Sequence, residues 1–440
     1  MLVVLIIMDH IPVEVIGHVL SLIGDARHVV IASVTCRKWR QAFYNYLHTL
    51  NFDDHNKHTV YGRFSGSEIE TLISNTIFQT TGLQCLSISM DGVSSISAAF
   101  VIDWLIYTGK TLRKLHFNLR TTPNFNILDK FDVSKMELLD LAGNTITITS
   151  GYGIFLCLRC LSLSHVVVSP LDLSLLLSAC PNMEVFNLDS LEFVMSHETT
   201  TIEFTTSTLK EASLQYVCFD NFILKADNLE KLQVRKCSFT AFDLLGKGTL
   251  RFLEIEYVIM SHFDIGENFQ NLEVVNVNNH QIIWENFHHM IARSAGLTRL
   301  KLWFPGFGKI LNMESISACF PLLSHLALKY DLTDESSLHW NATDSNLGGS
   351  YHFGNVVVLE LQCLFINSCF PLWLEELLKR CPKLRKLVIC GLEFLEAHVK
   401  CSSSVIERAN LKAQQLDFGM SCISKLMTKY EHVTVQFRYI

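Results

Sequence analysis

Apolar residues recur along most of the chain as Leu-x-x-Leu-x-Leu, and the clearest copy lies at 297–303. The last four residues of this copy alternate between inward and outward positions, which is the period of a strand with one buried face. One such strand cannot bury its apolar side alone, whereas a stack of strands can. The pattern therefore predicts a repeat protein built around parallel strands.

The spacing of the copies falls in the range of leucine-rich repeats. The shortest interval between successive first positions is 20 residues, from Leu209 to Leu229, and the longest is 33 residues, from Leu323 to Val356. The first positions are Leu83, Leu112, Met136, Leu158, Met183, Leu209, Leu229, Leu250, Leu272, Leu297, Leu323, Val356 and Leu384. We therefore predict an α/β solenoid over 48–440, a horseshoe with parallel strands on its concave face and helices or turns on its convex face.

Several linkers have the periodicity of amphipathic helices. The apolar stripes are Phe100, Val101, Trp104 and Leu105; Leu173, Leu176 and Leu177; and Trp373, Leu374, Leu377 and Leu378. Ser67 and Glu70 are spaced as a capping box. The linkers between Leu209 and Leu250 leave room for only a turn or a short helix. Polar residues at about 331–354 predict a loop insertion, and 413–418 and 433–437 predict terminal strands.

Residues 9–47 have a helical pattern instead. Pro12 suits the first turn of a helix, and apolar stripes continue to Phe43. Three short helices are too few for a robust core, so we expect them to dock on the repeats or on a partner. Met8 resembles a natural start, and the sequence leaves open whether residues 1–7 belong to the native protein.

Two segments of these helices resemble the opening and closing signatures of an F-box. They are Ile11-Pro12-Val13-Glu14-Val15-Ile16 and Val34-Thr35-Cys36-Arg37-Lys38-Trp39-Arg40, with Ile11 where leucine is common. The Cys-Pro joins at 180–181 and 381–382 are similar to those of plant-type F-box/leucine-rich-repeat proteins, where the cysteine is a packing residue. The alternative is an ordinary three-helix cap on a solenoid.

The resemblance implies an F-box at 9–47 that binds the Skp1 adaptor of cullin–RING ubiquitin ligases. Its adaptor-facing or supporting surface would comprise Pro12, Ile16, Leu20, Val34, Cys36 and Trp39. The chain would then be the substrate receptor of such a ligase, with no catalytic residues of its own. Two alternatives stay open: a Skp1-binding scaffold that does not promote degradation, and a hormone-type receptor that needs a small ligand.

Composition limits the other functional classes. The 36 basic and 43 acidic residues give a net charge of −7, which argues against a general nucleic-acid binder. The 14 cysteines form no disulfide framework, which favours the cytosol or the nucleus. Cys157 and Cys160 lack a second ligand pair, so no metal site is predicted. No cofactor and no membrane segment is predicted either.

One group of outward positions stands out as a target-binding surface. Arg299, Lys301 and Trp303 lie on one repeat, and His325 and Lys329 lie on the next. Lys231 and Arg235 extend this basic surface. Because Arg and Trp are enriched in binding hot spots, we predict that it captures an acidic or phosphorylated segment. The alternative is that exposed strand positions simply favour such residues. We also expect Lys301→Glu with Trp303→Ala to leave the melting temperature nearly unchanged.

Overall fold

The computed structural model describes most of the chain. The described residues are 10–53, 61, 64–90, 93, 95–130, 132–148, 153–193, 200–266, 268–278, 284–303, 313–330, 351–363, 370–390, 421 and 423–438. They form two compact units. Unit 1 comprises Met1–Asn228 and Ser238–Phe242, and unit 2 comprises Leu229–Cys237 and Asp243–Ile440.

Each unit is built on parallel strands that pair in chain order, one strand for each repeat. The strands of unit 1 are β1 (Thr49–Asp53), β2 (Cys85–Ser89), β4 (Lys114–Asn118), β6 (Leu138–Ala142), β8 (Cys160–Ser164), β10 (Val185–Asp189) and β13 (Glu211–Gln215). Those of unit 2 are β15 (Lys231–Arg235), β17 (Phe252–Glu256), β19 (Val274–Asn278), β20 (Arg299–Leu302), β21 (His325–Tyr330), β22 (Val358–Cys363), β23 (Lys386–Cys390) and β24 (Thr434–Arg438).

Alternate strand residues point to opposite sides, and one side is the core. Leu115, Leu161 and Leu253 are among the inward residues, each with an exposed fraction of 0%. All of the first positions predicted from the repeat spacing are at most 2% exposed. The other side, which we call the open strand face, carries the outward residues. The predicted α/β solenoid class is confirmed.

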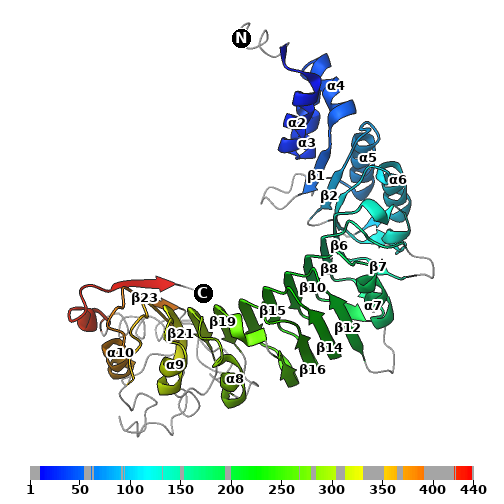
Figure 1. Ribbon diagram of the computed structural model, residues 1–440. Coiled ribbons are helices and arrows are strands. Elements are labelled where there is room, and N and C mark those ends of the chain that lie inside the picture. The colour runs from blue at the N-terminus through cyan, green and yellow to red at the C-terminus, as the bar shows by residue number, and fades with distance from the viewer. Residues whose placement is uncertain are drawn as a thin grey trace, which may run out of the picture. The chain divides into compact units, whose positions relative to one another are not determined.

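Helices connect many of the strands on the core side. Unit 1 contains α2 (Val13–Ile23), α3 (Ala26–Ser33), α4 (Arg37–Tyr46), α5 (Gly66–Ile77), α6 (Ala98–Thr108) and α7 (Pro170–Ser178). Unit 2 contains α8 (Trp284–Ile291), α9 (Met313–Cys319) and α10 (Phe370–Lys379), which lie along one side of their strands (Figure 1). Short 3₁₀ turns occur at Ile127–Lys130, Val133–Lys135 and Asn268–Asn271. The predicted helices at 100–105, 173–177 and 373–378 are confirmed.

The capping box of α5 lies two residues before the predicted position. Ser65 Oγ accepts a hydrogen bond from the Glu68 N–H at 3.4 Å, and Glu68 Oε2 accepts one from the Ser65 N–H at 2.8 Å. Ser67 and Glu70 have the same spacing, but Ser67 already lies inside the helix. The prediction that Ser67 begins the box was therefore wrong.

The linkers between Leu209 and Leu250 form strands, so the predicted turn or short helix was wrong, and the linkers on either side add one strand each to the same sheet. These strands are β12 (Thr201–Thr206), β14 (Cys218–Ala226), β16 (Ser238–Leu245) and β18 (Ile259–Asp264). In unit 1 they carry buried aromatic rings. Phe219 stacks on Phe222 at a centroid distance of 5.5 Å, and Phe222 stacks on Phe242 at 5.5 Å. Aromatic residues fit a pleated, half-buried surface, and this stack fills the core where helices are absent.

Smaller strands complete the outer layer of unit 1. They are β3 (Ile96–Ser97), β5 (Thr121–Thr122), β7 (Thr145–Ile146), β9 (Val167–Val168) and β11 (Glu192–Phe193). Cys180 lies just after α7 and is 1% exposed, and Cys381 in unit 2 is 2% exposed. Burial raises the pKa of each thiol to about 12. Both cysteines are therefore packing residues rather than nucleophiles.

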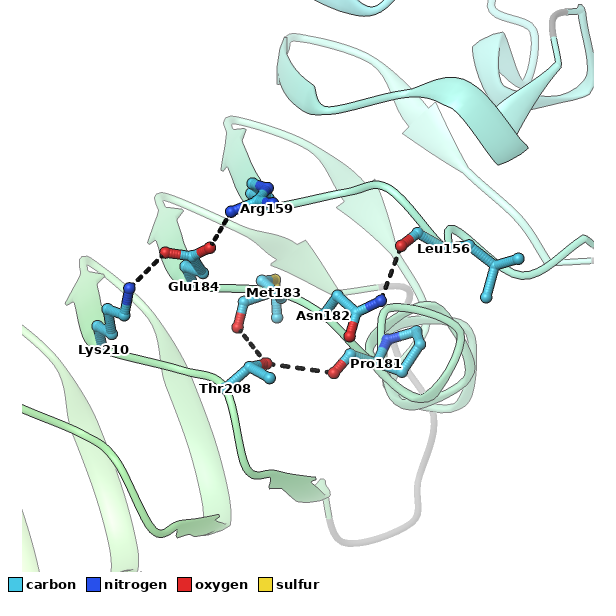
Figure 2. A network of polar contacts seen from close by, with 8 residues as sticks. All are labelled: Leu156, Arg159, Pro181, Asn182, Met183, Glu184, Thr208 and Lys210. Carbon is cyan, nitrogen blue, oxygen red and sulfur yellow. Dashed lines mark hydrogen bonds and ion pairs between the residues drawn. The ribbon is translucent and has the colours of Figure 1, made fainter.

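Charges of alternating sign precede the strands and link neighbouring repeats. Figure 2 shows Glu184 between Arg159 at 2.6 Å and Lys210 at 2.7 Å, so that three repeats are joined. The hydrogen bond from Lys210 is the main cause that lowers the pKa of Glu184. Arg113 pairs with Glu137 at 2.8 Å in the same way, and in unit 2 Arg251 pairs with Glu273 at 3.5 Å. These exposed pairs favour one register of the stack, although each contributes little stability.

Part of the predicted C-terminal region lies outside the described residues. The terminal strand predicted at 433–437 is β24. The strand predicted at 413–418 and most of the predicted loop insertion at 331–354 fall on residues that are not described. In the described part of the chain, no helix is long and apolar enough to cross a membrane.

Candidate interaction surfaces

The three N-terminal helices form a bundle with its own small core. Ile16, Leu20 and Val29 are at most 2% exposed. Helix α2 approaches α4 so closely that a Cβ on Gly17 would lie 2.3 Å from the Cβ of Tyr46. Glycine at this position is therefore required by the contact between the two helices.

Hydrogen bonds hold this bundle on the first repeat. The Asn51 N–H of β1 donates to the Gly24 carbonyl oxygen at 2.8 Å, and the His48 N–H donates to Ser21 Oγ at 2.9 Å. On the other side, the Thr81 N–H donates to the Tyr44 carbonyl oxygen at 3.0 Å. The bundle is thus fixed to the repeats of unit 1, which is one of the two arrangements that its small size predicted.

The outer side of the bundle is unusually apolar. Leu22 is 74% exposed, Ile31 is 53% exposed and Val34 is 61% exposed. We call the full set the N-terminal apolar surface: Val15, Val19, Leu22, Ile23, Val30, Ile31 and Val34, each at least 36% exposed. A groove of about 710 Å³ adjoins it between α3, α4 and α5. Clusters of exposed apolar residues often mark interaction sites, whereas apolar residues that are exposed singly are normal on protein surfaces.

The predicted Skp1-facing residues divide into two groups. Pro12, Val34 and Cys36 are exposed and Trp39 is half-buried, so these side chains can reach a partner. Ile16 and Leu20 are buried in the bundle and can only support the surface. Leu22 and Ile31 were missed. The sequence contained a signal for them, because Leu22-Ile23 and Val30-Ile31 are adjacent apolar pairs and a short helix cannot bury both members against one side.

In unit 2, the open strand face brings the predicted basic residues close to acidic ones. Arg235 Nη2 pairs with Glu254 Oε2 at 2.7 Å, and Arg235 Nε lies 3.7 Å from Glu256 Oε2. Gln233 donates a further hydrogen bond to Glu254 at 2.6 Å. The charge of Arg235 is therefore largely compensated within the protein.

The most buried charge on this face is Glu360, which the sequence did not single out. Its side chain is 7% exposed and lies 3.4 Å from His325 Nε2. The hydrogen bond with His325 is the main cause that lowers the pKa of Glu360 to about 2, with Lys301 nearby as a further cause. Cys390 Sγ donates to Glu360 at 3.6 Å. The predicted basic cluster is thus built around a carboxylate.

Arg299, Lys301 and Trp303 lie together, as predicted, but Trp303 is less exposed than predicted. Lys301 Nζ lies 3.2 Å from the centroid of the Trp303 ring, a cation–π contact. Burial lowers the pKa of Lys301, and Glu360 opposes this effect. Trp303 is only 9% exposed. The expectation that Trp303 is an outward, exposed residue was therefore wrong, while its effect on the melting temperature stays a prediction.

The remaining predicted residues lie on neighbouring positions of the same face. Lys231 begins β15, where its Nζ lies 6.0 Å from the Phe252 ring centroid, and Lys329 lies on β21, two residues after Ala327. The structure thus brings all the predicted residues of the basic surface onto the open strand face of one unit. Their role in binding a target stays a prediction.

The open strand face of unit 1 carries small polar residues instead. Ser87, His116 and Asp140 are register partners on three adjacent strands. His116 Nδ1 lies 3.1 Å from Asp140 Oδ2, but both side chains are more than a third exposed. In the described structure no hydrogen bond joins Ser87 to His116, and the strand N–H groups are committed to the sheet. This row therefore gives no support for nucleophilic catalysis. The described residues also contain no group of three or more metal-ligating side chains.

Comparison with known proteins gives a clear relative. No protein-family model matches the chain. The chain is 45% identical over 436 residues to F-box/LRR-repeat protein At1g67190 of Arabidopsis thaliana. The match covers 98% of this chain and 100% of the relative, so it includes both the N-terminal helices and the repeats.

Proposed function

Because the chain belongs to the F-box/LRR-repeat protein family, we propose that it is the substrate receptor of a Skp1–cullin–F-box ubiquitin ligase. In this function the N-terminal helices bind a Skp1-type adaptor, and the repeats hold a target protein. Ubiquitin transfer is then catalysed by partner enzymes, while this chain supplies proximity and orientation.

The observation that carries the proposal is the N-terminal apolar surface on a bundle fixed to the repeats. Seven aliphatic side chains at least 36% exposed within 20 residues, 15–34, would be costly to leave in water. The hydrogen bonds between the bundle and the repeats mean that a bound adaptor would take a defined position relative to the repeats of unit 1. A target held on those repeats would then be presented in a fixed orientation.

A pull-down with a purified Skp1-type adaptor tests the first half of the proposal. Leu22→Glu with Ile31→Glu places two charges in the apolar surface without touching the buried core. We expect adaptor recovery to fall at least about 10-fold. Leu171→Glu on α7, where leucine is 68% exposed, is the matched control and should recover adaptor like the wild type. Equal recovery from the double variant and the wild type would refute the adaptor-binding function.

A second measurement separates a degradative receptor from a non-degradative scaffold. Proximity labelling under proteasome inhibition identifies proteins near the chain, and their half-lives are then compared with and without it. A degradative receptor requires at least one labelled protein to become longer-lived when the chain is removed or carries Leu22→Glu with Ile31→Glu. Unchanged half-lives together with adaptor binding would favour the scaffold.

A further inference from the structure

We infer that Arg299 and Trp303, on either side of Lys301 on the open strand face of unit 2, form a recognition site for a carboxylate in an acidic peptide segment. The identification of this segment as part of a degradation target rests on the proposed substrate-receptor function. The site itself does not depend on adaptor binding.

Arg299 differs from Arg235 and Lys301 in the compensation of its charge. Arg235 is paired with Glu254 and Glu256, and Lys301 faces Glu360. In the described part of the chain, by contrast, Arg299 forms no ion pair, and its buried Nε has no hydrogen-bond partner. A guanidinium that is partly removed from water without an acceptor is unfavourable, and an incoming carboxylate would supply that acceptor.

Two further buried polar atoms near Arg299 lack partners. The indole Nε1 of Trp303 has no acceptor among the described residues, although the side chain is only 9% exposed. Asn276 Oδ1, on the neighbouring strand β19, has no donor there either, and Asn276 is the register partner of Lys301. Arg235 Nε and His325 Nε2, on the same face, also lack a hydrogen-bond partner among the described residues. Buried unpartnered groups are few in native proteins, so their concentration around β19 and β20, strands about 5 Å apart, indicates a site that a ligand completes.

The arrangement suits an extended peptide rather than a single small ion. Arg299 begins β20 and Trp303 directly follows its last residue, Leu302, so the two are four residues, or roughly 13 Å of backbone, apart. A carboxylate side chain can therefore meet Arg299 while a backbone carbonyl accepts the indole N–H of Trp303. The ring of Trp303 is held by Lys301, so this donor is preorganised.

The charge balance favours a carboxylate over a phosphate group. Arg299 has no ion-pair partner among the described residues, and it can neutralise a single negative charge. Glu360, Glu254 and Glu256 all act on Lys301 and therefore lie close to the site. They would repel the nearly double charge of a phosphate more strongly than the single charge of Asp or Glu.

The test is selection of peptides on the full-length chain. A displayed library of random twelve-residue peptides is selected on the immobilised wild-type protein, and enriched peptides are remeasured by fluorescence anisotropy. We expect an Asp or Glu at one fixed peptide position. Its replacement by Asn or Gln should weaken binding about 10-fold or more, and Arg299→Gln should weaken the acidic peptide equally without affecting its amide counterpart.

Control variants keep the result interpretable. Arg251→Gln removes one exposed positive charge of unit 2 and should bind like the wild type. Arg299→Lys keeps the charge but removes the Nε donor, and it should retain only part of the affinity. Circular dichroism confirms that each variant is folded, and the pull-down described above reports on adaptor binding separately.

Three outcomes would overturn the inference. They are the absence of any enriched peptide, enrichment without a fixed acidic position, and affinity that is insensitive to Arg299→Gln. Tighter binding of a phosphoserine version of the same peptide would assign the site to phosphate instead. Loss of adaptor binding with acidic-peptide binding intact would refute the proposed function while leaving the site established.

Discussion

The open strand faces of the two units share one backbone pattern but differ in chemistry. The central row of unit 1 runs through Ser87, His116, Asp140, Ser162 and Asn187 on successive strands. The equivalent row of unit 2 runs through Gln233, Glu254, Asn276, Lys301, Ala327 and Glu360. Apart from His116 and Asp140, the positions of this row are small or uncharged in unit 1, whereas in unit 2 they include Glu254, Lys301 and Glu360.

Each unit has a histidine–carboxylate pair on its open strand face, and the two pairs differ in burial. His116 and Asp140 are 3.1 Å apart with side chains 38% and 39% exposed. His325 and Glu360 are 3.4 Å apart with side chains 20% and 7% exposed. The shorter pair is screened by water, so burial rather than distance decides which pair contributes more to stability.

The largest expected effect is at Trp303 in unit 2. Trp303→Ala removes a side chain that is 9% exposed and in contact with Lys301, so the free energy of unfolding should fall by about 3–4 kcal/mol. Chemical denaturation of the full-length chain measures this loss. Trp303→Phe keeps most of the volume and should cost less than about 1.5 kcal/mol. If Trp303→Ala caused a negligible loss, the Trp303 side chain would contribute no more to the free energy of unfolding than a surface residue does.

Glu360→Gln should have the next largest effect. The substitution keeps the shape but removes the buried carboxylate that pairs with His325 and lies near Lys301. We expect the free energy of unfolding at neutral pH to fall by about 3 kcal/mol. Glu314→Gln, at an exposed position on α9, is the control and should change it by less than about 0.5 kcal/mol. If the Glu360→Gln variant were as stable as the wild type, the buried pair of Glu360 with His325 would contribute no more to stability than the solvent-screened pair of Asp140 with His116.

The stabilisation by Glu360 should also depend on pH. Its pKa is about 2 in the folded protein and 4.5 ordinarily. The contribution is therefore complete above pH 4.5 and is lost as the pH falls towards 2. Between pH 7 and pH 3 the stability gap between the wild type and Glu360→Gln should narrow by about 2 kcal/mol. Parallel denaturation curves at the two pH values check this, and a constant gap would contradict it.

The sequence was sufficient for the repeat because burial in a solenoid follows a simple period. Each first position, from Leu83 to Leu384, is buried, since every repeat must cover the next. The strands in the short linkers were not predicted, because the length of these linkers was taken to leave room for only a turn or a short helix. Alternating charges precede the strands in the sequence, as at Arg159, Glu184 and Lys210. Only the alignment of the strands shows that these residues form ion pairs between neighbouring repeats.

The candidate site was predicted in position but not in electrostatics. Arg299, Lys301 and Trp303 do lie together, because residues two apart on a strand share a face. That Trp303 is buried could not be deduced, since strand alternation would place it outward with Lys301. The role of Glu360 depends on two register steps across β21 and β22, from Lys301 to Ala327 to Glu360, and a linear sequence does not show that proximity.

The smallest expected effect sharpens the comparison from the side of unit 1. Asp140→Asn removes the carboxylate that pairs with His116, yet both side chains are more than a third exposed and solvent already screens the pair. The free energy of unfolding should change by less than about 0.5 kcal/mol at neutral pH, measured beside Glu360→Gln under the same conditions. His116→Gln should be equally mild, because neither partner leaves a buried charge behind. A loss comparable to that of Glu360→Gln would mean that the open strand face of unit 1 also depends on its few charged residues. Burial would then not explain the difference between the two faces.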